Sequence, residues 1–119
     1  MNSGKFGEDF TVKFLEDKGY EILDRNYHSR WGEIDIIAKL DQCIVFCEVK
    51  TRKSVSYGNP SEFVTPKKME KIIKTAMIYL DGNDCEMRFD VAEVFLKKDG
   101  ATINYIENAF GGSYEIFSY

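Results

Sequence analysis

Two apolar stretches decide the fold: Gly32-Glu33-Ile34-Asp35-Ile36-Ile37-Ala38 and Cys43-Ile44-Val45-Phe46-Cys47-Glu48-Val49-Lys50. Both are rich in β-branched residues and only a short turn at residues 40–42 separates them, so they predict two antiparallel strands joined as a hairpin. The second stretch is apolar at successive positions over residues 43–47. Because side chains alternate between the faces of a strand, this pattern predicts a central strand that is covered on both faces.

The flanking sequence predicts the rest of an α/β fold with a mixed β-sheet flanked by helices. A first helix is expected over residues 4–18, with Phe6, Phe10 and Phe14 in one narrow apolar arc. Thr65, as an N-cap before a proline, predicts a second helix that extends to residue 80. Further strands are expected at residues 20–27, 87–96 and 102–106, with a turn at 28–30. The expected order is α-β-β-β-α-β-β.

Length and composition bound the class of protein. The 119 residues fit a single domain spanning 1–119. A composition of 44% hydrophobic and 30% charged residues supports a packed core and excludes intrinsic disorder. No apolar run approaches the length of a membrane span, and the first residues lack the apolar stretch of a signal peptide. The three cysteines have no framework spacing, so they are expected to be reduced core residues. A cytoplasmic protein with no membrane partner is therefore expected.

The net charge of −4 conceals a strongly basic segment. Residues 50–80 carry seven Lys or Arg against two Asp or Glu. A local patch of this kind can bind phosphates even on an acidic protein, because charge is screened over about 8 Å. The candidate nucleic-acid-binding residues are Arg52, Lys53, Lys67, Lys71 and Lys74. The alternative is a solvated, lysine-rich helix face.

Charged residues inside the apolar strands are the candidate metal-binding and catalytic residues. In the expected hairpin Asp35 lies opposite positions 47–49, beside Glu48, and Lys50 follows on the same face of the strand. Two neighbouring carboxylates repel unless a cation lies between them. Their oxygens, with the backbone carbonyl of Val49, suit Mg²⁺ or Mn²⁺, and a lysine beside them can orient a water and stabilise charge on a phosphate. The alternative is an internal carboxylate–lysine ion pair.

Six ordered motifs extend this local pattern over residues 4–110. They are Gly7-Glu8, Asn26-Tyr27, residues 32–38, residues 46–52, Arg88-Phe89-Asp90-Val91 and Asn108-Ala109-Phe110. Together they resemble the YraN-like family of small bacterial proteins, which is similar to archaeal Holliday-junction resolvases of the Hjc type. Cys47 departs from the family pattern, which more often has an aliphatic residue there.

The resemblance implies the restriction-endonuclease-like core, α-β-β-β-α-β plus a final strand, with the D…(D/E)-x-K site of that superfamily. Carried over to this sequence, Asp35 and Glu48 match the metal-ligand positions, Lys50 the catalytic lysine and Glu8 an acid on the first helix. Resolvases of this type cut two strands symmetrically, so the resemblance also implies a homodimer. The C-terminal residues 109–119 could contribute to it or pack back on their own sheet.

Two function classes follow. The first is a Mg²⁺- or Mn²⁺-dependent endonuclease that hydrolyses phosphodiester bonds in DNA, with branched or junction DNA as a candidate substrate. The second is a non-catalytic module that keeps the nuclease fold and binds nucleic acid or another protein. Trp31 and Tyr57 are candidates for stacking on bases, with packing against the protein as the alternative for each.

Overall fold

The two stretches that decide the fold pair as the sequence predicts. In the computed structural model, which describes residues 2–53 and 65–110, β2 (Gly32–Leu40) and β3 (Cys43–Arg52) are antiparallel. Ile36 pairs with Cys47 and Ile37 with Phe46. One step further along this register lie Asp35 and Glu48. The expected juxtaposition of the two carboxylates across the strand pair is therefore present.

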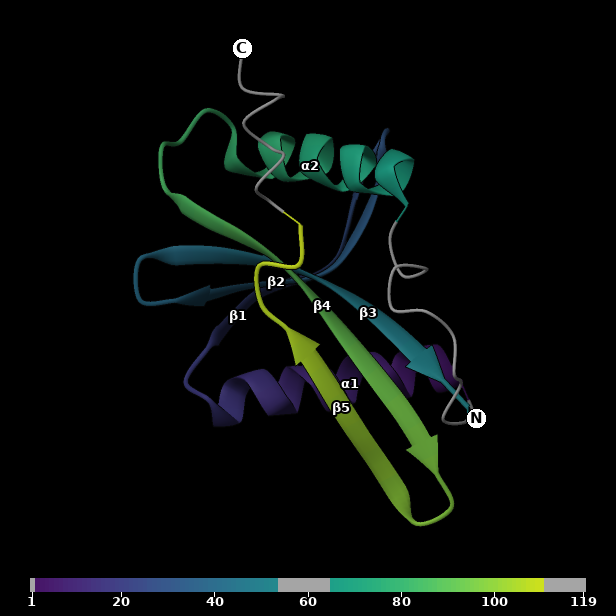
Figure 1. The fold of residues 1–119 in the computed structure, drawn as a ribbon. Helices are drawn as coiled ribbons and strands as arrows, with labels where there is room; N and C mark the ends of the chain where they lie inside the picture. Colours follow the sequence, from purple (N-terminus) through teal and green to yellow (C-terminus); the bar gives the residue numbers. More distant parts are fainter. Residues whose placement is uncertain (1, 54–64, 111–119) are drawn as a thin grey trace.

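Within the described residues the chain forms one mixed sheet of five strands, in the order β1-β2-β3-β4-β5, and two helices (Figure 1). β3 and β4 are parallel, and the other neighbouring strands are antiparallel. The order of elements matches the prediction. The remaining bounds are α1 Ser3–Asp17, β1 Glu21–Ser29, α2 Pro66–Leu80, β4 Glu86–Lys97 and β5 Gly100–Ile106.

β3 is the central strand, and each of its faces packs against a different helix (Figure 1). Phe46 belongs to the core cluster under α2, with Ile73 and Phe89. Val45 and Cys47 belong to the cluster under α1, with Leu15. The successive apolar positions of this strand are therefore explained by burial on both sides. No helix among the described residues is long and apolar enough to cross a membrane.

The two helices compare differently with their predictions. α2 begins as expected, with the Thr65 hydroxyl accepting a hydrogen bond from the Lys68 amide and Pro66 at the first helical position. α1 is present, but its apolar arc is not the face that packs most closely on the sheet: Phe6, Phe10 and Phe14 are only partly buried. The face that packs on the sheet consists of Gly7, Glu8, Thr11 and Leu15.

A close approach between α1 and β3 explains this rotation of the helix. A Cβ atom placed on Gly7 would lie 1.9 Å from Oγ1 of Thr51, so only glycine allows the helix to approach this strand so closely. The contact turns Glu8 inward as well, toward the end of the sheet. One turn prediction also fails, because His28 and Ser29 still pair with β2 and the chain turns at residues 30–31.

Tyr57, with the rest of residues 54–64, and the C-terminal residues 111–119 lie outside the described part of the chain. Phe110, the last described residue, is buried under α2 and its ring stacks on Phe89 at 5.2 Å between centroids.

Candidate functional site

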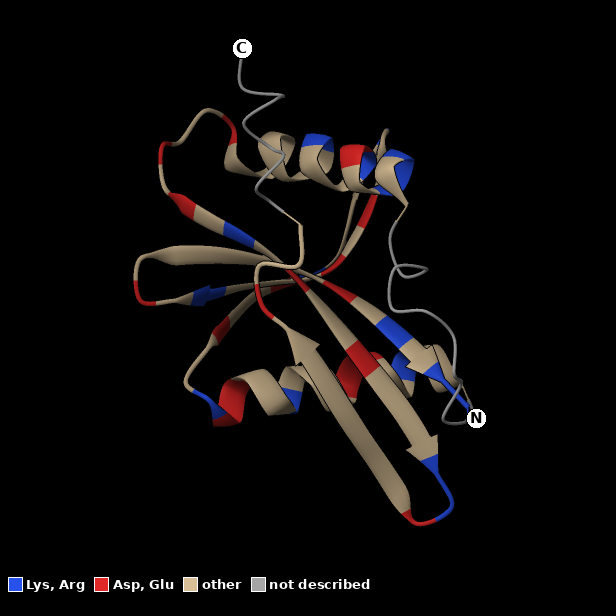
Figure 2. Ribbon diagram, viewed as in Figure 1, with Lys and Arg blue, Asp and Glu red and all other residues tan. Residues whose placement is uncertain are grey.

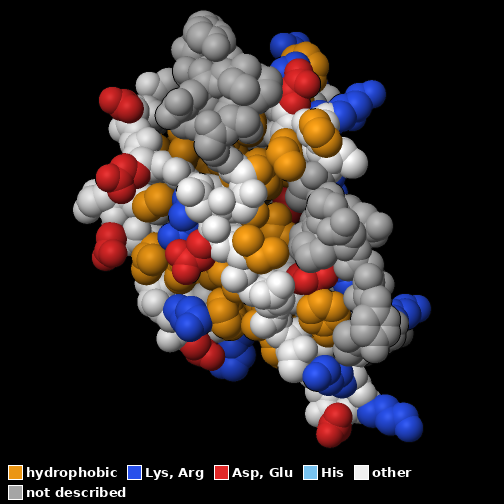
Figure 3. All heavy atoms as spheres, in the orientation of Figure 1, with side chains coloured by type: hydrophobic (Ala, Val, Ile, Leu, Met, Phe, Trp, Pro, Cys, Tyr) orange, Lys and Arg blue, Asp and Glu red, His pale blue; other side chains and the backbone are white. Residues whose placement is uncertain are grey.

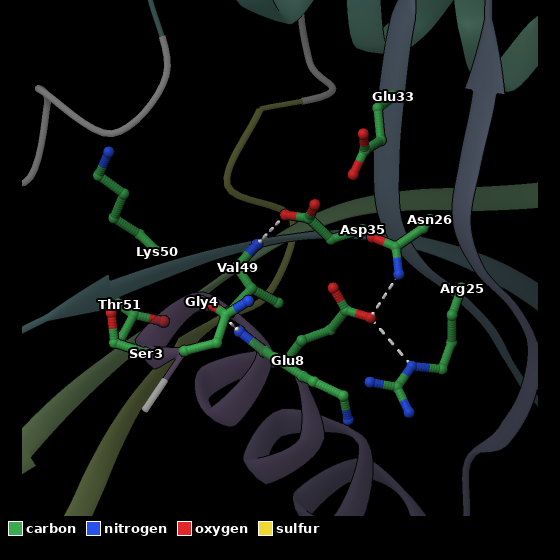
Figure 4. Close-up of a pocket in the computed structure, with 12 residues that line it drawn as sticks. Ser3, Gly4, Glu8, Arg25, Asn26, Glu33, Asp35, Val49, Lys50 and Thr51 are labelled. Carbon is green, nitrogen blue, oxygen red and sulfur yellow. Dashed lines mark hydrogen bonds and ion pairs between the residues drawn. The ribbon is translucent and has the colours of Figure 1, made fainter.

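A pocket of about 840 Å³ opens at one end of the sheet, beside the start of α1 (Figure 4). It receives residues from α1, β1, β2 and β3, including four of the sequence-predicted site residues. The residues that line it are Asn2, Ser3, Gly4, Lys5, Glu8, Arg25, Asn26, Glu33, Asp35, Val49, Lys50 and Thr51. In Figure 2 red and blue segments of α1 and β3 meet in this region. The pocket therefore collects charged side chains from elements that are distant in sequence.

Asp35 lies at the centre of the pocket. Its Oδ2 accepts a 2.8 Å hydrogen bond from the backbone N–H of Val49 on the neighbouring strand (Figure 4). Burial raises the pKa of Asp35, and the charges of Glu33 and Glu8 raise it further, against the lowering effect of the Val49 hydrogen bond. The strand pair thus holds this carboxylate in place in surroundings that favour its neutral form.

Glu48 lies on the α2 side of the strand pair. The residue is buried at 8% exposure, and Oε1 has no hydrogen-bond partner among the described residues. Its Oε2 lies 3.4 Å from Nζ of Lys68. Burial, followed by the charge of Asp35, raises the pKa of Glu48 to about 7, although Lys68 acts in the opposite direction. The two strand carboxylates are therefore electrostatically coupled, and one buried oxygen is unsatisfied.

Glu8 reaches the pocket from α1, the helix on which the resemblance places an acid, but its carboxylate already has partners. Oε1 accepts hydrogen bonds from Nε of Arg25 at 3.0 Å and from Nδ2 of Asn26 at 2.9 Å (Figure 4). Asn26 has a φ of +53°, in the left-handed region that asparagine adopts more readily than most residues. Sequence analysis singled out Asn26 only as part of a motif and missed Arg25, because nothing in the spacing links either residue to Glu8.

Lys50 lines the same pocket as Asp35, but it does not contact the carboxylates. Its side chain extends away from Asp35 and Glu8 (Figure 4). No ion pair joins Lys50 to another described residue. Glu33 also faces this pocket, and one of its oxygens lies 2.9 Å from Nε2 of His28. The lysine is thus near enough to act on a molecule in the pocket and is not held by the acids.

The predicted basic residues fall into two groups. Arg52 is largely buried, and its Nε lies 2.7 Å from Oε2 of Glu93 on β4. Arg52 therefore belongs to an internal ion pair. Lys53 is exposed at the end of β3. The other predicted basic residues lie on α2. Lys67 and Lys71 are exposed, whereas Lys74 pairs with Glu70 at 3.1 Å.

Asp35 and Glu48 are the side chains of this region that could hold a divalent cation, with few protein ligands. Asp35 and Glu48 supply carboxylate oxygens from adjacent strands, and the buried, unpartnered Oε1 of Glu48 is an acceptor that a cation would satisfy. Mg²⁺ commonly binds through one or two carboxylates and keeps several waters. Within the described residues there is no group of three or more His, Cys, Asp or Glu side chains arranged to hold a metal. Val49, whose backbone carbonyl is the third predicted ligand, lines the pocket.

The fold and this pocket define a small α/β protein with coupled carboxylates at one end of a mixed sheet. The chain belongs to the uncharacterised protein family UPF0102, whose profile matches residues 7–94. It is 50% identical over 112 residues to a UPF0102 protein of Alkaliphilus oremlandii, covering 90% of this chain and 96% of that protein. It is 43% identical over 110 residues to a UPF0102 protein of Syntrophomonas wolfei, with 90% and 96% covered. The expected YraN-like family is thereby confirmed.

Proposed function

We propose that this protein is a metal-dependent endonuclease that hydrolyses phosphodiester bonds in DNA, with branched DNA among its substrates. The sheet order and the two flanking helices are compatible with the restriction-endonuclease-like core that the resemblance implies. The three cysteines at positions 43, 47 and 85 are free, in keeping with the reducing cytoplasm as the proposed compartment.

One observation carries the proposal: the charge of Asp35 acts on Glu48 across two strands, and the buried Oε1 of Glu48 has no partner among the described residues. An unsatisfied buried carboxylate oxygen costs free energy unless a ligand binds it. Asp35 is in addition oriented by a backbone hydrogen bond, as a ligand for a metal should be. A purely structural ion pair would leave neither the unpartnered oxygen nor a neighbouring carboxylate whose charge raises the pKa of Glu48.

The chain's own residues have distinct roles in this proposal. Asp35, Glu48 and the Val49 carbonyl would hold the cation, which when bound would polarise a phosphate oxygen and lower the pKa of a water. Lys50, which lines the same pocket as Asp35 and forms no ion pair with a described residue, would orient the attacking water and stabilise negative charge that develops on the phosphate. Glu8 would act indirectly and not as a direct ligand of the cation, because Arg25 and Asn26 already hold its carboxylate.

The test is cleavage of end-labelled junction, duplex and single-stranded DNA with Mg²⁺ or Mn²⁺ and with EDTA, combined with calorimetric titration of Mn²⁺. Asp35→Asn and Glu48→Gln are expected to lose Mn²⁺ binding and cleavage together, and Lys50→Ala to lose cleavage while it retains Mn²⁺ binding. Glu86→Gln is the matched control, since Glu86 is an exposed carboxylate at the start of β4. Cleavage that survives in both Asp35→Asn and Glu48→Gln would refute the proposal.

A non-catalytic nucleic-acid-binding module is the second candidate. The observation in its favour is that Lys50 contacts neither Asp35 nor Glu48, and Glu8 is occupied by its own partners. DNA binding by the wild-type chain without cleavage of any substrate in either metal would select this candidate.

A further inference from the structure

An exposed tryptophan lies among cations at the turn between β1 and β2. Trp31, the single tryptophan of the chain, is 38% exposed. Nζ of Lys74 lies 4.3 Å from the centre of its ring and the guanidinium of Arg30 lies 5.1 Å from it. In Figure 3, blue side chains gather around the end of the molecule where α2 begins. Trp31 therefore presents part of its aromatic ring on a basic surface.

The turn that carries Trp31 is fixed against α2. The Trp31 amide donates a 3.0 Å hydrogen bond to Oγ of Ser29, and that hydroxyl lies 2.7 Å from Oγ1 of Thr75 on α2. Gly32 follows directly and packs near Lys71, where an added Cβ would lie 3.8 Å from that of the lysine. The backbone that carries the indole is thus held at a defined place beside the helix, as a stacking platform requires.

A second pocket, of about 390 Å³, lies between this turn and the first two turns of α2. Trp31 and Glu33 line one side, and Lys67, Lys68 and Lys71 line the other. Lys68 is paired with Glu48, whereas Lys67 and Lys71 form no ion pair with any described residue. Glu33 also lines the pocket that contains Asp35. The basic pocket therefore adjoins the proposed catalytic pocket through a shared residue.

We propose that Trp31, Lys67 and Lys71 form a binding surface for single-stranded DNA that leads an unpaired strand toward Asp35. The choice of DNA rests on the proposed endonuclease function, and the inference adds that the substrate contains an unpaired segment. An indole binds a base by stacking on its face, which a base in a continuous duplex does not expose. Lys67 and Lys71 lie one helical turn apart on the same face, where they reach successive phosphates.

The cations on the indole are consistent with this use. Arg30 is exposed and the Lys74 side chain is 43% exposed, so either can move from the ring to a phosphate and free one face of the indole for a base. A protein-docking patch of similar size would be expected to present several apolar side chains. Here Trp31 is the exposed aromatic among Arg30, Lys67 and Lys71.

Trp31 itself reports on the test, because it is the sole tryptophan. The protein is titrated in EDTA with an oligothymidylate of about 12 nucleotides, within the span of known single-strand sites, and with a blunt duplex of similar length. The single strand is expected to quench Trp31 emission and to bind at least tenfold more tightly than the duplex. Unchanged emission on binding, or equal quenching by the duplex, would overturn the inference.

Variants separate stacking from charge, with binding followed by the anisotropy of a labelled oligothymidylate. Trp31→Ala is expected to weaken binding about tenfold, and Trp31→Phe much less. The double change Lys67→Ala, Lys71→Ala should lower the salt slope by about 1.4, at roughly 0.7 per lost phosphate contact. The charge-matched control is Lys97→Ala with Lys98→Ala, exposed residues near the β4–β5 turn at the far end of the sheet (Figure 2). Equal losses in both double variants would overturn the inference.

Failure of this inference is distinguishable from failure of the proposed function. If Trp31→Ala and wild type bind the oligonucleotide equally and both cleave DNA with Mn²⁺, the binding surface is wrong and the endonuclease stands. If Trp31 emission is quenched but no DNA is cleaved, the endonuclease proposal fails and the single-strand surface stands.

Discussion

Nζ of Lys68 lies 3.4 Å from Oε2 of Glu48, so a cation carried by α2 partly compensates the carboxylate that β3 buries. The ammonium also opposes the effect of burial on the Glu48 pKa. A lysine in this position competes with any metal for the same charge. The ion pair therefore connects the position of α2 with the affinity of the proposed metal site.

Lys68→Met is accordingly expected to bind Mn²⁺ about three- to tenfold more tightly, because it removes a positive charge beside Glu48. The same change should destabilise the metal-free protein, since it leaves the buried carboxylate without its cation. Calorimetry gives the affinity and urea unfolding in EDTA gives the stability. Lys67→Met, one residue away and without an ion pair to a described residue, is the control. Weaker Mn²⁺ binding by Lys68→Met would show that the lysine orients Glu48 rather than competing with the metal.

Glu48→Gln is expected to stabilise the metal-free protein above neutral pH. The folded-state pKa of Glu48, about 7, exceeds the ordinary value of 4.5, so the folded state retains a proton that the unfolded state has lost. Wild-type stability should therefore fall as pH rises from about 4.5 through 7, and the variant should lack this fall. The difference should reach about 1–3 kcal/mol at pH 8 and vanish below pH 4.5. Urea unfolding at pH 4.5 and 8 in EDTA measures it, and a variant less stable than wild type at pH 8 would contradict the assignment.

Asp35→Asn is expected to lower the pKa of Glu48, because the Asp35 charge is a main cause of its elevation after burial. The amide oxygen can still accept the Val49 N–H, so the fold should be retained within about 0.5 kcal/mol. Asp35→Ala, which leaves that N–H without its acceptor, should cost about 1–2 kcal/mol more. Carboxyl carbon chemical shifts against pH report the Glu48 titration. An unchanged Glu48 titration in Asp35→Asn would mean that the two carboxylates do not interact.

The sequence predicts the carboxylate pair because the hairpin turn and the alternation of strand side chains are local properties. Asp35 and Glu48 are close in sequence, and the register that joins them follows from the turn. Glu8, Arg25 and Asn26 are brought together only by tertiary packing, which spacing does not encode. Their one sequence signal is Gly7, whose missing side chain allows the close approach to β3.

The packed face of α1 does not follow from periodicity, for the same reason. Periodicity favours the aromatic arc of Phe6, Phe10 and Phe14, but burial follows the face on which the backbone can approach the sheet. Lys68 was likewise missed as a partner of Glu48. It lies one turn before buried Ile72, so its position on the inward edge of α2 was the available signal.

The homodimer implied by the resemblance is a further prediction. Sedimentation at micromolar concentration should give twice the monomer mass, because two equivalent sites related by a two-fold axis suit a two-stranded substrate. Truncation after Phe110 should weaken the dimer and leave the fold intact, since it retains the ring that stacks on Phe89 in the core. Phe110→Ala in the full chain is the contrasting variant, expected to cost about 3 kcal/mol of stability. If both the full and the truncated chain sediment as monomers, the prediction of a homodimer is wrong.

Gly7→Ala tests whether the approach of α1 to β3 positions the pocket. The new methyl group would meet Oγ1 of Thr51 at 1.9 Å and its Cβ at 3.1 Å, so the helix or the end of β3 must move. We expect a loss of about 1–3 kcal/mol in urea unfolding, although alanine is the better helix former. Gly4→Ala is the matched control in the same helix: its Cβ would meet only Oδ1 of Asn2, at 3.4 Å, so it should be neutral or stabilise by up to about 1 kcal/mol. Because the shift would also move Glu8 away from Arg25, Mn²⁺ binding should weaken in Gly7→Ala and not in Gly4→Ala. If both variants gain stability and bind Mn²⁺ as the wild type does, the close approach is dispensable and Glu8 plays no part in the site.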